Sequence, residues 1–187
     1  MMKIIDLNPD NESVIEQVAN LLVDSFKEHW PDAWPTIEAA LEEVRESFEP
    51  DRISRVAVDE QKRVLGWIGG IRHYDGHVWE LHPLVVRADC RRQGVGRALV
   101  EDLEQQAGRR GGLTIFLGTD DEDNMTSLAG VDLYPDPLEH LAKIENLKRH
   151  PYEFYQKLGF TIVGVLPDAN GLGKPDIFMA KHVTKQG

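Results

Sequence analysis

The stretch "CRRQGVGRALV", residues 90–100, decides the fold, because it sets three arginines around two glycines where a helix is expected to begin. A strand is expected just before it ("HVWELHPLVV", residues 77–86), and apolar residues recur every four positions from Val95 to Ala107. The first N–H groups of a helix lack partners within the helix, and the helix dipole adds positive charge there. Glycines let this backbone approach a ligand closely. The order strand, glycine turn, helix therefore predicts a site for a phosphate or pyrophosphate.

The glycine turn differs from two common nucleotide-binding loops. No Lys-Ser/Thr pair follows its second glycine, and its spacing is not G-x-G-x-x-G. Two glycines after basic residues also fit a plain surface turn that starts a helix. Taken alone, the turn leaves both interpretations open.

The composition indicates a soluble globular protein. The 187 residues suit one domain with a sizeable core, with 41% hydrophobic and 28% charged residues. The formal net charge of −11 argues against nucleic acid or an anionic membrane as a partner. It is compatible with a cationic substrate, although solubility explains the charge equally well. The single cysteine excludes an internal disulfide and fits a reducing compartment, and no apolar signal or membrane-spanning run is seen, so we expect a cytoplasmic protein.

The rest of the chain predicts an α/β (α+β) fold with one mixed central sheet and helices on both faces. A first strand ("KIIDL", residues 3–7) precedes two amphipathic helices, the first of them capped by Asn11, and then a hairpin over residues 53–74. Pro83 lies inside the next strand and cannot donate to a ladder, so it predicts a bulge. After the helix of residues 95–110 and the strand "LTIFLGT" (113–119) comes a connection of unusual length, with a helix expected over 138–148. A short helix (151–159) and two closing strands ("TIVGVLP" and "DIFMAKHV") complete the chain.

Together with Pro83 and "FYQKLGF" (154–160), the arginine–glycine stretch resembles the GNAT superfamily of acetyl-CoA-dependent N-acetyltransferases. Its pyrophosphate loop, Gln/Arg-x-x-Gly-x-Gly/Ala, is matched by residues 91–96. Within the superfamily the chain is similar to the chromosomal type of aminoglycoside 6′-N-acetyltransferase, through "WELHPLVV", "GGLTIFLGTDD", "HPYEFYQKLGF" and "VGVLPDANGLGKPDIFMAK". The resemblance implies a single GNAT domain over residues 1–187, with a subgroup insert at 120–150 and a sheet splayed at the bulge. It also implies acetyl-CoA as cosubstrate, no metal, and a homodimer.

The resemblance assigns roles to the residues around acetyl-CoA. The strand next to Pro83 pairs with the pantetheine arm through Leu84, Val85 and Val86. The N–H of Leu84 stabilises the carbonyl oxygen as it gains charge, and Tyr155 gives a proton to the departing thiolate. The pyrophosphate is bound by consecutive residues of the loop: Arg91, Arg92, Gln93, Gly94, Val95, Gly96, Arg97 and Ala98.

The acceptor amine requires residues of its own. Glu80 and His82 project from one face of a strand, since side chains two apart point the same way. Glu80 is expected to bind the ammonium and to pass its proton to water or to His82. A carboxylate beside an ammonium also favours the charged form, so positioning comes first for Glu80 and base catalysis second. For His82 a structural role is the alternative.

Further acceptor contacts are expected from aromatic and acidic residues. Phe26 and Trp30 lie in the region that forms the acceptor wall in this fold, although core or lid positions would explain them too. Asp120 and Asp121 follow a central strand, where ligands of α/β proteins tend to bind. A solvated acidic loop is the alternative for both.

The predicted function is direct acetyl transfer from acetyl-CoA to a primary amine, most of all the 6′-amine of aminoglycoside antibiotics. The partner is then a cationic small molecule, without nucleic acid or membrane. Two alternatives remain: an N-acetyltransferase for a polyamine or a small basic protein or peptide, and a non-catalytic sensor that binds acyl-CoA.

Overall fold

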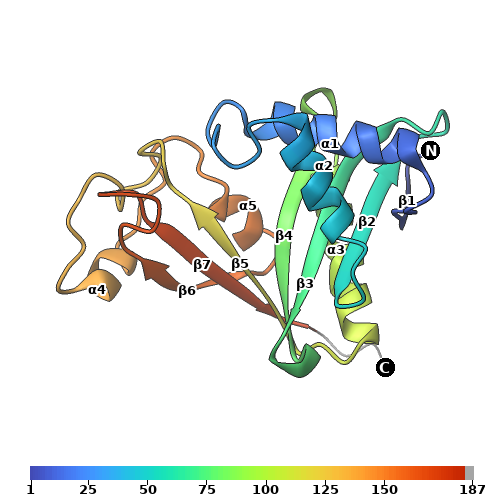
Figure 1. Ribbon diagram of the computed structural model, residues 1–187. Coiled ribbons are helices and arrows are strands. Elements are labelled where there is room, and N and C mark those ends of the chain that lie inside the picture. Colours follow the sequence, from blue (N-terminus) through green and yellow to red (C-terminus); the bar gives the residue numbers. More distant parts are fainter. Residues whose placement is uncertain (184–187) are drawn as a thin grey trace. The chain divides into compact units, whose positions relative to one another are not determined.

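The computed structural model describes residues 1–183, which divide into two compact units (Figure 1). Unit 1 comprises residues 1–115 together with Val183, and unit 2 comprises Phe116–His182. None of the helices found in residues 1–183 combines the length and the apolar character that crossing a lipid bilayer requires. The expectation that the whole chain forms one domain stays a prediction.

Unit 1 is built on four antiparallel strands in the order β1-β2-β3-β4. These are β1 (Lys3–Asp6), β2 (Arg52–Val58), β3 (Val64–His73) and β4 (Val78–Val86). The predicted hairpin is confirmed as β2 and β3. Its turn is fixed by Asp59, whose carboxylate accepts the backbone N–H groups of Gln61 and Arg63 at 3.0 and 2.9 Å.

Helices cover both faces of the sheet in unit 1. They are α1 (Glu12–Phe26), α2 (Ile37–Glu46) and α3 (Val95–Arg109). Ser54 of β2 lies 2.9 Å from the hydroxyl of Ser47, which ends α2, whereas its neighbour Arg55 donates to Asp102 of α3 at 2.7 Å. Because successive side chains of a strand point to opposite faces, α2 and α3 lie on opposite faces. The two first helices confirm the sequence prediction.

Helix α1 begins where the sequence predicts it. The side chain of Asn11 accepts the N–H of Val14 at 3.3 Å, and Thr36 caps α2 in the same way through Ala39 at 3.2 Å. The apolar stripe of α1 is buried in one core cluster with α2 and the sheet. The members of this cluster include Val14, Ile15, Val18, Leu22, Val44, Trp67 and Val85.

The bulge predicted at Pro83 is confirmed in β4. Ile68 of β3 pairs with Leu84, but Gly70 pairs with Leu81, so β4 carries one extra residue between these two pairs. The extra residue falls at the His82–Pro83 peptide, which is cis. Opposite stands Gly69, where any Cβ would overlap the carbonyl oxygen of His82. One added residue inverts the alternation, so His82 and Val85 reach the α1–α2 face together although three positions apart.

Unit 2 contains strands in the order β5-β7-β6, with β6 and β7 antiparallel. The strands are β5 (Thr114–Asp120), which starts in unit 1, β6 (Thr161–Leu166) and β7 (Asp176–His182). Two short helices, α4 (Pro137–Leu141) and α5 (Tyr152–Gln156), belong to the same unit. Short 3-10 turns lie at Tyr74–Gly76 (η1) and Ala88–Cys90 (η2) in unit 1.

The helix expected over residues 138–148 is wrong in length, since α4 ends at Leu141. The reason lies in the backbone of the residues that follow. The carbonyl of Glu145 accepts the N–H of Ser127, and the N–H groups of Leu147 and Lys148 bond to the carbonyl of Met125. Because these backbone groups bond to another segment of the insert, they are not available for the hydrogen bonds that would continue the helix. The predicted α/β class with a mixed sheet is otherwise confirmed, and its splaying at the bulge stays a prediction.

Candidate active site

The glycine turn leads into helix α3, whose N-terminus has no capping side chain among residues 1–183. Gly94 is the N-cap of α3 with a φ of 87°, and Arg92, two residues earlier, has a φ of 61°. The first turn of α3 also holds no acidic residue. The first N–H groups of α3 therefore remain available for an anionic ligand. The residues predicted to bind pyrophosphate are mostly exposed here, with Val95 buried beneath them.

Asp89 shapes this loop and was not predicted from the sequence. Its carboxylate accepts from Arg87 at 3.1 Å and from Arg63 at 3.3 Å, and its backbone carbonyl accepts from the side chain of Gln93 at 2.8 Å. The hydrogen bond from Arg87 lowers the pKa of the Asp89 carboxyl. An acidic residue inside a basic stretch suggests repulsion of phosphate. Only the contacts show that Asp89 holds the loop together.

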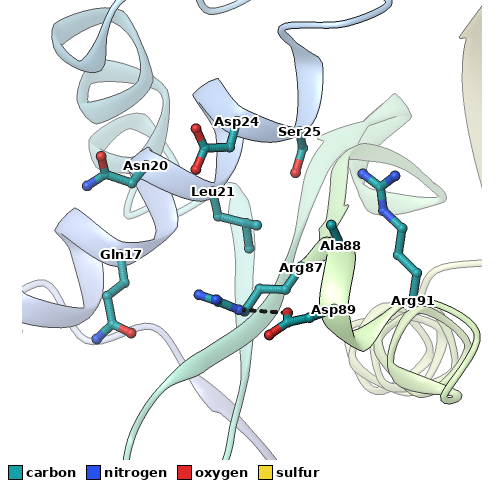
Figure 2. A pocket seen from close by; sticks show the side chains of 9 residues that line it. All are labelled: Gln17, Asn20, Leu21, Asp24, Ser25, Arg87, Ala88, Asp89 and Arg91. Atoms are coloured by element: carbon teal, nitrogen blue, oxygen red, sulfur yellow. Dashed lines mark hydrogen bonds and ion pairs between the residues drawn. The ribbon is translucent and has the colours of Figure 1, made fainter.

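A pocket of about 500 Å³ opens between α1 and the segment that enters the loop (Figure 2). Arg87 and Asp89 are bonded to each other at its lower edge, and Arg91 extends beside it. Arg91 is thus shared between the pocket and the predicted pyrophosphate loop. The pocket is lined by Gln17, Asn20, Leu21, Asp24 and Ser25 of α1 and by Arg87, Ala88, Asp89 and Arg91.

Glu80 on β4 is held by a histidine from the neighbouring strand. Nε2 of His73 lies 2.8 Å from Oε2 of Glu80, with 38% and 27% of the two side chains exposed. An ionised carboxylate only accepts hydrogen bonds, so His73 is the donor. His73 was not predicted, because the contact depends on a strand register that the sequence does not give. Glu80 is partly exposed and is held by a hydrogen bond, a position that suits binding of a cation.

A chain of aromatic contacts leads from His82 to Trp30. The ring of Trp34 lies 5.9 Å from His82 and 4.6 Å, edge-on, from Phe26, and Phe26 lies 5.6 Å from Trp30. The buried Trp34 thereby links His82 to Phe26, and Phe26 in turn contacts Trp30, so the three residues predicted for the acceptor side are connected through aromatic rings. Phe26 also packs against the core, and its role in the acceptor wall stays a prediction.

Beyond the bulge, β4 is paired with β3 along one edge. Leu84, Val85 and Val86 stand opposite Ile68, Trp67 and Gly66. In an antiparallel pair only alternate residues direct their N–H and C=O groups at the partner strand. The intervening groups point to the other edge, which is the arrangement that pairing with a pantetheine arm requires. These roles stay predictions.

Tyr155 lies on α5 in unit 2, half-buried between aromatic rings. Its ring centroid is 5.1 Å from Phe154 and 5.7 Å from Phe160. Desolvation raises the pKa of Tyr155 well above its ordinary value. The phenol is therefore protonated at neutral pH and is able to act as a proton donor.

His150, also not predicted, ties the end of β5 to the start of α5. Its Nδ1 accepts the N–H of Tyr152 at 3.2 Å, so Nε2 carries the hydrogen and donates to the carbonyl of Asp120 at 3.0 Å. Burial lowers the pKa of this imidazole. The carboxylate of Asp120 in turn accepts from Asn170. The sequence offers only that His150 opens the stretch "HPYEFYQKLGF", which carries the family resemblance.

Asp121 is more deeply buried than Asp120. It is fully buried, and its two carboxylate oxygens accept the N–H groups of Met125 and Thr126, both at 2.7 Å. This carboxylate organises the first turn of the insert. We therefore leave Asp121 out of the acceptor site proposed below. Among residues 1–183 no three metal-ligating side chains gather into a site.

Comparison with known proteins gives consistent matches. The profile of the Acetyltransferase (GNAT) family matches residues 15–134. A crystal structure of aminoglycoside 6′-N-acetyltransferase complexed with coenzyme A is 44% identical with a TM-score of 0.88, and that of the enzyme from Enterococcus faecium is 44% identical with a TM-score of 0.87. Aminoglycoside 6′-acetyltransferase type Ii is 39% identical with a TM-score of 0.73. Each similarity covers 99% of this chain and 99% of the other. The comparison with curated proteins found no match.

Proposed function

Because the chain belongs to the acetyltransferase (GNAT) family, we propose that it transfers the acetyl group of acetyl-CoA to the 6′-amine of aminoglycoside antibiotics. One observation carries the proposal. Over 99% of its length the chain is 44% identical to an aminoglycoside 6′-N-acetyltransferase whose crystal structure contains coenzyme A. Identity at this level along whole chains supports a shared reaction and a shared cosubstrate.

The loop before α3 is proposed to bind the pyrophosphate of acetyl-CoA. The uncapped N–H groups of α3 and the exposed side chains of Arg91 and Arg92 support this assignment. Leu84, Val85 and Val86 are proposed to pair with the pantetheine arm. The bulge next to them supports this role, because it interrupts the regular ladder of β4.

The reaction is proposed to be a direct attack. The neutral amine adds to the thioester carbonyl carbon, and the N–H of Leu84 stabilises the oxygen that gains charge. The C–S bond then breaks, and the departing thiolate takes a proton from Tyr155. The amine gives up its own proton to water, to Glu80 or to His82. Desolvation raises the pKa of Tyr155, so the phenol is protonated in the free protein and a proton is present for the thiolate.

The acceptor is proposed to bind along Glu80 and His82, with Phe26 and Trp30 as an aromatic wall. For Asp120 the role of an acceptor contact stays a prediction. The fixed carboxylate of Glu80 and the rings gathered around Trp34 support this arrangement. Its anionic and aromatic character suits a polycationic sugar.

Two further features are proposed for the whole molecule. A homodimer is proposed, supported by exposed Val163 and Leu166 on strand β6 at the end of the strand order. A cytoplasmic location is proposed, supported by the use of a single, buried cysteine.

An acetylation assay with a panel of amines tests the proposal. Acetyl-CoA is supplied with kanamycin-like aminoglycosides, with polyamines and with basic peptides, and thiol release is followed. We expect turnover with aminoglycosides that carry a 6′-amine and none with matched 6′-hydroxyl compounds. Turnover of polyamines or peptides alone would move the assignment to another acceptor. Tight acetyl-CoA binding without any turnover would favour the sensor.

A further inference from the structure

His73 of β3 holds the carboxylate that we propose binds the acceptor. It donates from Nε2 to Oε2 of Glu80 over 2.8 Å. Within residues 1–183 this is the one hydrogen bond that the structure gives the Glu80 side chain, and it uses a single oxygen. We infer that His73 is a positioning residue that turns the other oxygen, Oε1, toward the acceptor ammonium. The inference rests on the proposed function.

The backbone of two paired strands sets this contact. Ile71 stands opposite Glu80, and His73 opposite Val78, so His73 is the diagonal neighbour of Glu80 on one sheet face. The pairing runs without interruption from Leu81 to Val78 and precedes the bulge. A rigid hairpin thus presents the imidazole at a constant place.

Arg52, which lies across the sheet from Glu80, forms an ion pair with a different carboxylate. Arg52 of β2 stands opposite Ile71, which separates it from Glu80, and it lies 3.8 Å from Glu46 at the end of α2. On the other side of Glu80, His82 projects from the same face and contacts the ring of Trp34. His73 is therefore the side chain placed to fix the Glu80 carboxylate.

A fixed carboxylate binds a cation with a smaller loss of side-chain freedom than a mobile one. Glutamate has several rotamers when unrestrained, and ordering it on binding costs affinity. With His73 present, that ordering is already complete in the free protein. The benefit concerns acceptor binding, because neither residue belongs to the loop proposed for acetyl-CoA.

The test is a mutant cycle measured by steady-state kinetics. His73→Ala should raise the acceptor KM by about fivefold while the KM for acetyl-CoA stays unchanged. His73→Gln, whose amide nitrogen reaches to a similar place, should restore the acceptor KM to near the wild-type value. In a Glu80→Ala background, His73→Ala should change nothing further. His77→Ala, an exposed histidine of the same hairpin, is the matched control and should behave as wild type.

The outcomes separate this inference from the proposed function. Equal losses in His73→Ala and His73→Gln, or a loss that persists in the Glu80→Ala background, would make His73 a structural residue and overturn the inference. If the wild-type protein acetylates the acceptor and His73→Ala leaves the acceptor KM unchanged, the inference is overturned and the proposed function stands. A wild-type protein that acetylates no amine would overturn the proposed function and this role with it. Where Glu80→Ala turns over too slowly, acceptor binding by calorimetry with coenzyme A present completes the cycle.

Discussion

Gly69 faces the carbonyl oxygen of His82 so closely that a side chain on Gly69 would overlap it. The partner atom belongs to the backbone of the bulge and is unable to swing away. Gly69→Ala should therefore shift β4 at the site proposed for the thioester and lower the free energy of unfolding by about 1–3 kcal/mol. Thermal and urea unfolding measure the loss. Gly164→Ala is the matched control, because a Cβ there meets nothing within 4 Å; equal stability of the two variants would contradict the close approach.

Gly94→Val should weaken acetyl-CoA binding by about tenfold, measured by calorimetry. A Cβ on Gly94 meets no protein atom within 4 Å, so crowding inside the protein is not the cause. The cause is the φ of 87°, which a β-branched residue resists and asparagine tolerates. Gly94→Asn should therefore retain most of the affinity. Equal weakening by both would show that a side chain there meets the ligand itself, and full affinity in both would refute the loop as the pyrophosphate site.

Tyr155→Phe should reduce kcat by about a hundredfold and leave acetyl-CoA affinity intact. The phenylalanine keeps the ring contacts with Phe154 and Phe160, so unfolding should be unaffected. Stopped-flow measurement of thiol release isolates the chemical step. A variant with the wild-type kcat would mean that water, and not the phenol, protonates the thiolate.

His150 should make stability depend on pH. Burial lowers the pKa of its imidazole in the folded protein, so below about pH 6.5 the unfolded chain binds more protons than the folded one. The free energy of unfolding should then fall as the pH drops, by at most about 1.4 kcal/mol per pH unit. Urea titrations from about pH 7.5 to 5.5 follow the fall. His150→Gln should be less stable at pH 7.5 but flatter with pH, and an unchanged slope would assign the effect to another group.

Elements whose signals are local could be predicted from the sequence. Asn11 predicts the first helix by capping chemistry, and Pro83 predicts the bulge because proline has no N–H to donate to a ladder. The glycine turn likewise predicts the start of α3 from the residues immediately before the helix. Each signal lies within a few residues of the feature it predicts.

Features that depend on distant pairing could not be predicted. The periodicity of residues 138–148 is helical, yet their backbone groups bond to residues 125–127 across the insert. His73 reaches Glu80, and His150 reaches Asp120, through registers and chain paths that no short pattern encodes. Asp121 illustrates the same limit in reverse. Its acidity favours a binding role, whereas its burial reveals a backbone anchor.

The ion pairs of Asp89 change how ligands are attracted from a distance. Its carboxylate already occupies Arg63 and Arg87, and Arg97 lies 3.7 Å from Glu101. On a protein of net charge −11, little long-range pull then remains for an anionic cosubstrate, whose capture depends on contacts made at close range. A polycationic acceptor experiences the opposite field. Rising ionic strength should therefore slow the arrival of the acceptor but not that of the anionic coenzyme.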